Sequence, residues 1–292
     1  MSSSPAPECV WPLAAELGEG PLWSADEKVL WFVDIKQKKI HRFDPATGKG
    51  SSFEVPAPPG FLAHVKGGGL LVGMKTGLAR FDPTTGAIHS LRPVEPDKPG
   101  NRLNDGTVDP EGRLWFGSMD DSEEAPSGSL FCLDGSGLRA RDPDYVITNG
   151  PAFSPDGRTL YHTDTLKKII YAFDVDAAGE IAAKRVFVTI EDGAGYPDGP
   201  TVDAEGCLWT GLFAGWSARR YSPKGELLAT VRFPCANVTK IAFGGPDLRD
   251  VYATTAWKGL DAAARAAQPL AGGLFRFRSG VPGLPAHEVI HA

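Results

Sequence analysis

An internal repeat constrains the fold of this chain more than any other feature. An aromatic or apolar residue within a strand-like segment recurs 40 to 48 residues apart, at Trp31, Leu71, Trp115, Tyr161, Trp209 and Tyr252. Each marker lies in a strand–turn–strand unit whose turns contain Asp-Pro or Asp-x-x-Gly, in which Asp bonds its own backbone and Gly accepts positive φ. Repeats of about 40–50 residues with this content are typical of β-propellers. We therefore predict one all-β domain, residues 1–292, folded as a six-bladed β-propeller with four-stranded blades.

Two segments do not follow the repeat. Residues 260–268 are rich in Ala and end before Pro269, which predicts a short helix inserted in the last blade. The leading stretch, residues 10–14, has no hairpin partner of its own. We expect that either this stretch or the tail at residues 287–290 completes the last blade and closes the ring.

Composition and charge exclude several classes of partner. A net charge of −6 without a basic stripe argues against nucleic acid. No apolar run approaches the roughly 18–20 residues that cross a bilayer, and the N-terminus shows no signal-peptide pattern. The four cysteines are far apart, without a Cys-x-x-Cys pair, which favours free thiols in a reducing compartment. We expect a cytoplasmic protein and, because no large apolar patch is marked, a monomer.

The repeats share a register that brings oxygen-bearing side chains together. Five residues before the turn-opening residue of four units stand Glu19, Asn104, Asn149 and Asp198. The innermost strands of a propeller surround its axis, so equivalent positions form a ring. The other two units place Phe61 and Thr239 there. Each Asp-Gly or Asn-Gly could be an ordinary turn dipeptide, but four in register predict a metal site with carboxylate and amide ligands.

Other catalytic chemistries lack their motifs. The sequence contains no Gly-x-Ser-x-Gly elbow for a serine nucleophile and no Gly-rich phosphate-binding loop. Its six histidines show no zinc-binding spacing. Arg102, two residues before Asn104, is either a solvated surface group or a side chain that projects over the mouth of the same channel.

Several motifs distributed over essentially the whole chain resemble those of the SMP-30/gluconolactonase family of regucalcin-like sugar lactonases. They are Gly18-Glu-Gly-Pro21, Arg102-Leu-Asn-Asp-Gly106, Gly117-Ser-Met119, Thr148-Asn-Gly-Pro151, Tyr196-Pro-Asp-Gly-Pro200 and Pro269-Leu-Ala-Gly-Gly-Leu274. The resemblance implies that Glu19, Asn149 and Asp198 bind one divalent metal ion. It also implies that Arg102 and Asn104 contact the sugar. One departure concerns the segment after Met119, where animal members carry glutamates and this chain has Asp120-Asp121, so we expect a different pocket.

The resemblance implies hydrolysis of an aldono-1,4- or 1,5-lactone, such as xylonolactone or gluconolactone, to the aldonic acid. A divalent ion (Fe²⁺, Zn²⁺, Mn²⁺ or Ca²⁺) would polarise the carbonyl and lower the pKa of its bound water. Asp198 is the expected general base, and Arg102 and Asn104 are expected to orient the substrate. Two alternatives stay open: a non-catalytic calcium-binding or partner-binding propeller, and a metal-dependent ester or phosphotriester hydrolase.

Overall fold

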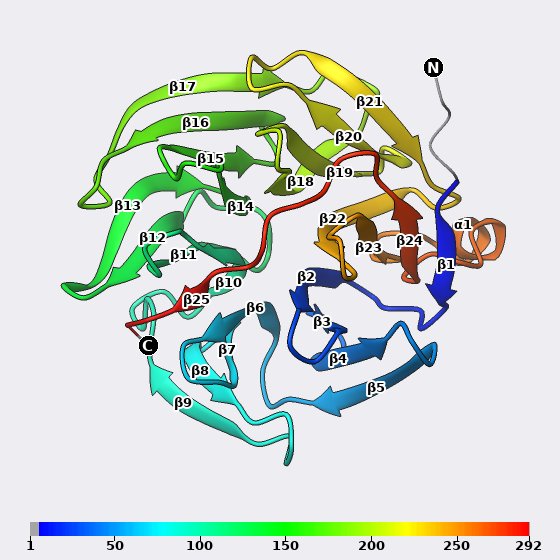
Figure 1. Ribbon diagram of the computed structural model, residues 1–292, viewed down its shortest axis with the longest axis horizontal. Coiled ribbons are helices and arrows are strands. Elements are labelled where there is room, and N and C mark those ends of the chain that lie inside the picture. Colours follow the sequence, from blue (N-terminus) through cyan, green and yellow to red (C-terminus); the bar gives the residue numbers. More distant parts are fainter. Residues whose placement is uncertain (1–5, 292) are drawn as a thin grey trace.

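The computed structural model describes residues 6–291, and its strands are arranged around a central axis (Figure 1). Residues 1–5, which belong to the N-terminal stretch without a signal-peptide pattern, lie outside the described part. The all-β prediction is confirmed, since the described chain contains 25 strands and one six-residue helix. None of the described helical residues form a segment long and apolar enough to cross a membrane.

Three sheets are antiparallel four-stranded meanders, each named below after its first strand. The β2 group contains β2 (Gly18–Ser24), β3 (Val29–Asp34), β4 (Lys39–Asp44) and β5 (Lys49–Glu54). The β10 group contains β10 (Asn101–Val108), β11 (Leu114–Asp120), β12 (Gly128–Asp134) and β13 (Gly137–Tyr145). The β14 group contains β14 (Thr148–Phe153), β15 (Thr159–Asp164), β16 (Ile169–Val175) and β17 (Ile181–Thr189).

The two larger sheets contain the same meander with additions. The β6 group has β6 (Pro59–Val65), β7 (Leu70–Met74), β8 (Gly77–Phe81) and β9 (Ile88–Arg92), and β25 (Glu288–Val289) joins its inner edge. An eight-stranded sheet combines two groups. The β18 group contains β18 (Tyr196–Val202), β19 (Leu208–Phe213), β20 (Ser217–Tyr221) and β21 (Leu227–Arg232). The β22 group contains β22 (Asn237–Gly244), β23 (Asp250–Ala256), β24 (Leu274–Arg278) and β1 (Glu8–Trp11). These two groups are joined by one parallel residue pair, Gly199 with Lys240.

The first strands of the groups form the inner ring of the molecule. β2, β6, β10, β14, β18 and β22 each contact the next, and β22 contacts β2 again. In Figure 1 these strands lie around the centre and the last strand of each group lies at the periphery. This radial order of four-stranded groups is the arrangement of a β-propeller. It places one residue of every inner strand near the central axis.

Both chain termini take part in the sheets. β1 pairs antiparallel with β24, so the leading segment, rather than the tail, completes the β22 group. β25 instead pairs in parallel with β6, after the tail has crossed one face of the molecule (red in Figure 1). The helix α1 (Ala262–Ala267) lies between β23 and β24, within the segment expected to be helical, and Asp261 caps its N-terminus by accepting from the backbone N–H of Ala264.

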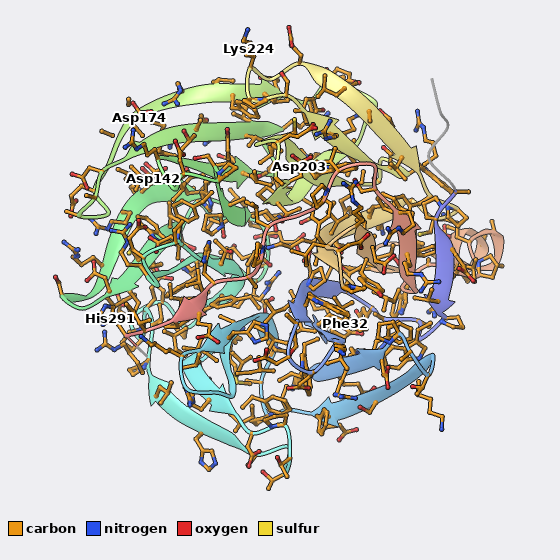
Figure 2. The ribbon with its side chains drawn as sticks, in the orientation of Figure 1. Phe32, Asp142, Asp174, Asp203, Lys224 and His291 are labelled. Carbon is orange, nitrogen blue, oxygen red and sulfur yellow. The ribbon has the colours of Figure 1, made fainter. Side chains whose placement is uncertain are left out.

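An aspartate–tryptophan contact is repeated at two of the aromatic markers of the sequence, Trp115 and Trp209. Oδ2 of Asp109 accepts from the indole Nε1 of Trp115 at 2.8 Å, and Oδ2 of Asp203 accepts from Nε1 of Trp209 at 2.9 Å. The other oxygen of each aspartate accepts two backbone N–H groups of its own turn. Figure 2 shows Asp203 nearer the centre of the molecule than Asp142, Asp174 and Lys224. The aspartate therefore joins the turn to the strand that follows it.

The hydrophobic core lies between neighbouring strand groups. Each apolar cluster combines residues of two adjacent groups, for example Trp31 with Phe81 and Trp209 with Phe243. Because burial of apolar surface is the main stabilising contribution, adjacent groups are held together chiefly by these contacts. The inner strands also enclose a central cavity, whose wall is mostly apolar.

Candidate active site

Irregular pairing in the inner strands directs the predicted site residues toward the axis. Antiparallel register is interrupted after Glu19 in β2, after Asn149 in β14 and on both sides of Asp198 in β18. Such bulges redirect side chains. Gly20 and Gly150, which follow two of these residues, have positive φ values of 54° and 83°, a conformation that other residues rarely adopt. The X-Gly-Pro motif is thus a local bulge that points residue X inward.

All five predicted site residues line one cavity, which we call the site pocket. Glu19, Arg102, Asn104, Asn149 and Asp198 contribute to its wall, and its volume is about 220 Å³. The remaining wall comes from Leu17, Met119, Glu123, Ile147, Thr165, Leu166, Tyr196, Phe213 and Lys258. Phe61 and Thr239, at the equivalent positions of the other inner strands, do not line this pocket. Phe61 is fully buried, and the Thr239 hydroxyl donates to the carbonyl of Gly18 at 2.6 Å.

Two buried carboxylates face each other on the floor of the site pocket. Burial raises the pKa of Glu19 to about 7, and the nearby charge of Asp105 adds to this while Lys240 opposes it. Burial also raises the pKa of Asp198 well above its usual range, and the charges of Glu19 and Asp105 act in the same direction. Like charges in one desolvated site repel each other, so a cation between them would be strongly favoured.

The side-chain oxygens on the floor of the site pocket fit a divalent cation. Nδ2 of Asn149 donates to Oγ1 of Thr165 at 2.9 Å, which leaves Oδ1 on the side of the pocket. Oxygen from this amide and from the carboxylates of Glu19 and Asp198 matches the preference of Ca²⁺, Mg²⁺ and Mn²⁺. Among the described residues, no group of three or more His, Cys, Asp or Glu side chains is arranged to hold a metal ion, so the candidate ligand set here has two carboxylates and an amide.

A buried ion pair lies under this floor. Nζ of Lys240 donates to Oδ1 of Asp105 at 2.6 Å, and Asp105 also accepts the backbone N–H groups of Gly106 and Gly150. Lys240 lines a second, central cavity of about 230 Å³. The pair therefore lies between the site pocket and the central cavity. It also links the β10, β14 and β22 groups.

Two of the three nitrogens of the Arg102 guanidinium donate hydrogen bonds to acceptors within the protein. Nε donates to Oδ1 of Asp121 at 3.0 Å, and Nη1 donates to Oδ1 of Asn104 and to the carbonyl of Leu103. Within residues 6–291, no hydrogen-bond acceptor is found for Nη2. The amide Nδ2 of Asn104 donates to Oδ1 of Asn149 at 3.0 Å and to the carbonyl of Thr148. Nη2 of Arg102 is thus the donor left for a ligand.

The two aspartates after Met119 are held by contacts outside the site pocket. Asp120 accepts from Ser122, Glu124 and Ala125 in its own turn, hydrogen bonds that hold its pKa below the usual range. Asp121 accepts from Lys36, Lys75 and Arg102. Burial opposes ionisation of Asp121, but these cations outweigh it and its pKa is lowered. Neither aspartate lines the pocket.

The acid in the pocket wall is Glu123, which pairs with Lys258 from the connection between β23 and β24. Sequence reasoning missed Glu123, Lys258 and Thr165 because all three lie in connections between strands, where the repeat register does not apply. The only signal for the first was the run of acids at residues 120–124.

Comparisons with known proteins show which family the chain belongs to. Residues 17–257 match the family model described as "SMP-30/Gluconolactonase/LRE-like region". The chain is 37% identical to regucalcin of Xenopus laevis over 286 residues, 95% of this chain and 96% of the relative. It is 34% identical to 6-deoxy-6-sulfogluconolactonase of Pseudomonas putida, covering 94% and 96% of the two chains. A solved structure of a calcium-binding protein, regucalcin, from Agrobacterium tumefaciens superposes with a TM-score of 0.93 at 29% identity, covering 98% of this chain and 97% of that one. The chain belongs to the SMP-30/gluconolactonase family.

Proposed function

We propose that this protein is a metal-dependent sugar lactonase that hydrolyses an aldono-1,4- or 1,5-lactone, such as xylonolactone or gluconolactone, to the aldonic acid. The observation that carries the proposal is one pocket with two buried, mutually repelling carboxylates on its floor and an uncommitted guanidinium nitrogen in its wall. The name of the Pseudomonas relative, a sugar lactonase, supports the same class of reaction. We also propose that the six strand groups are the six blades of a single domain.

Glu19, Asn149 and Asp198 would hold one divalent ion, which when bound would polarise the lactone carbonyl as a Lewis acid. Asp198 would take a proton from the attacking water and return it to the ring oxygen when the ring opens, a role typically worth about 10²–10⁴-fold in rate. Nη2 of Arg102 would donate to an oxygen of the sugar and hold the ring in the orientation that reaction requires. The apolar wall, including Ile147 and Phe213, would limit access of other water.

Protein stripped of metal and reloaded with Mn²⁺, Zn²⁺, Fe²⁺ or Ca²⁺ should be tested on xylono-, glucono-, galactono- and arabinonolactone, with acid release as the readout. Turnover of at least one lactone in a metal-loaded form, and its loss after chelation, is the expected result. Metal-dependent thermal stabilisation without turnover of any lactone would instead favour the calcium-binding scaffold. Faster turnover of aryl esters or phosphotriesters than of any lactone would favour the ester hydrolase.

A further inference from the structure

A directed series of hydrogen bonds links three groups of strands at the site pocket. Oγ1 of Thr165 donates to the carbonyl of Pro197 at 2.9 Å and accepts from Nδ2 of Asn149 at 2.9 Å. Oδ1 of Asn149 then accepts from Nδ2 of Asn104 at 3.0 Å. Because a hydroxyl has one proton, donation to Pro197 obliges Thr165 to act as an acceptor toward Asn149.

We propose that Thr165 is a positioning residue that sets the amide orientation of Asn149. This inference rests on the proposed function, in which the amide oxygen of Asn149 binds the metal ion. The two ends of an asparagine amide are nearly equal in shape, so hydrogen bonding decides which end faces the pocket. If the amide were reversed, two acceptors would meet at Thr165, two NH₂ groups would meet at Asn104, and N–H groups would point toward the cation.

The position of Thr165 gives it a second effect. It follows β15, it is buried in the pocket wall, and its backbone N–H donates to the carbonyl of Ile147. Its acceptor, the carbonyl of Pro197, belongs to the residue before Asp198. One hydroxyl therefore connects Asn149 on β14 to the segment of β18 that carries Asp198. Loss of the hydroxyl would disturb two proposed ligands together.

A matched control is present two residues earlier. Thr163 is also fully buried, but its hydroxyl has no hydrogen-bond partner among the described residues. Thr→Val replacement removes a hydroxyl at nearly constant volume at both positions. T163V therefore reports the effect of the replacement in a buried setting, whereas T165V reports the loss of the two hydrogen bonds.

The test is calorimetric titration of Mn²⁺ and Ca²⁺ into metal-stripped wild type, T165V, T165S, T165A and T163V, with thermal unfolding of each stripped protein. Because loss of a residue that orients a metal ligand typically weakens binding about 10–100-fold, we expect that range for T165V and T165A. T165S and T163V should bind within about threefold of wild type, as neither loses the hydrogen bonds in question.

Wild type that binds neither Mn²⁺ nor Ca²⁺ would be titrated with Zn²⁺ and Fe²⁺ as well, and binding of none of the four ions would overturn the metal-dependent function, and the inference with it. Wild type that binds, with T165V and T165A both binding within threefold of it, would overturn the inference alone. If T165V does not fold, T165A and T165S provide the same comparison of hydroxyl lost against hydroxyl kept.

Discussion

The charges around Asp198 indicate how its replacement should behave. Asp198 is buried within reach of the charges of Glu19 and Asp105, and it is proposed both to bind the metal ion and to move a proton. Arg102, in contrast, supplies one hydrogen-bond donor from the wall. These roles predict different kinetic effects.

We expect Asp198→Asn to lower kcat/KM by at least about 10²–10⁴-fold, because the general base is lost. Arg102→Ala should mainly raise KM, since it removes a contact to the substrate rather than to the proton in transfer. Steady-state kinetics on the best lactone of the panel measures both effects. Turnover of Asp198→Asn close to wild type would contradict the role given to this residue.

A buried histidine away from the site pocket gives the molecule a pH-dependent stability. His162 is fully buried, its ring lies edge-on to Tyr145 with centroids 4.9 Å apart, and burial lowers its pKa from 6.5 to about 3. In the unfolded chain His162 is protonated near pH 6.5, whereas in the folded protein it is protonated only near pH 3. The stabilisation is therefore complete above pH 6.5 and is lost as the pH falls.

This linkage predicts that His162 alone lowers the free energy of unfolding by about 2 kcal/mol between pH 7 and pH 5. His162→Phe, which keeps a ring beside Tyr145, should flatten the dependence over this interval. Denaturant titrations at half-unit pH steps measure it for both proteins. Identical slopes of wild type and variant would show that His162 is not responsible.

At the scale of the elements, the turn between the first and second strands varies among the groups in an informative way. Asp109 and Asp203 satisfy the indole of the following tryptophan, but the equivalent residue of the β2 group is Ser24. The indole Nε1 of Trp31 is consequently buried without a partner among the described residues. Arg42 lies opposite Trp31 in β4, as Arg220 lies opposite Trp209 in β20.

We expect Ser24→Asp to raise the free energy of unfolding by about 1 kcal/mol, because it supplies the missing acceptor for Trp31 next to Arg42. Ser24→Ala is the control and should not stabilise the protein. Chemical denaturation of the three proteins measures the difference. A Ser24→Asp protein less stable than Ser24→Ala would mean that the cost of burying the carboxylate exceeds its hydrogen bonds.

The elements also show which parts of the structure were predictable from the sequence. The repeat predicted the strand meanders, and its register placed Glu19, Asn149 and Asp198 at equivalent points of inner strands. Turn chemistry at residues such as Asp109 is local, so the sequence reveals it. Contacts between loops are not local: the ion pair of Glu123 with Lys258 joins residues 135 positions apart, and no periodic signal indicates it.

For the molecule as a whole, the floor of the site pocket has a charge imbalance that a metal ion would correct. Three buried carboxylates, of Glu19, Asp105 and Asp198, share one buried ammonium, that of Lys240. A divalent ion would bring the group to formal neutrality. Because the carboxylates come from three strand groups, their repulsion acts on the ring rather than on one sheet.

We expect a divalent ion at about 100 times its Kd to stabilise the stripped protein by about 2.7 kcal/mol, provided that it binds only the folded state. The effect would appear as a rise in Tm of several degrees. Glu19→Gln should show a smaller rise but a higher Tm than wild type in the stripped form, because one repelling charge is gone. Scanning calorimetry with and without metal gives both values; equal Tm values for stripped and loaded wild type would contradict the charge argument.

The pairing of β1 with β24 sets an order of events during biosynthesis. Trp11 leaves the ribosome 263 residues ahead of its partner Leu274. At about 5–20 residues per second, the N-terminal strand waits on the order of 10 to 50 s for its partner. Each earlier strand group can form its hairpins as it emerges, but the circle of sheets can be joined only after β24 has emerged.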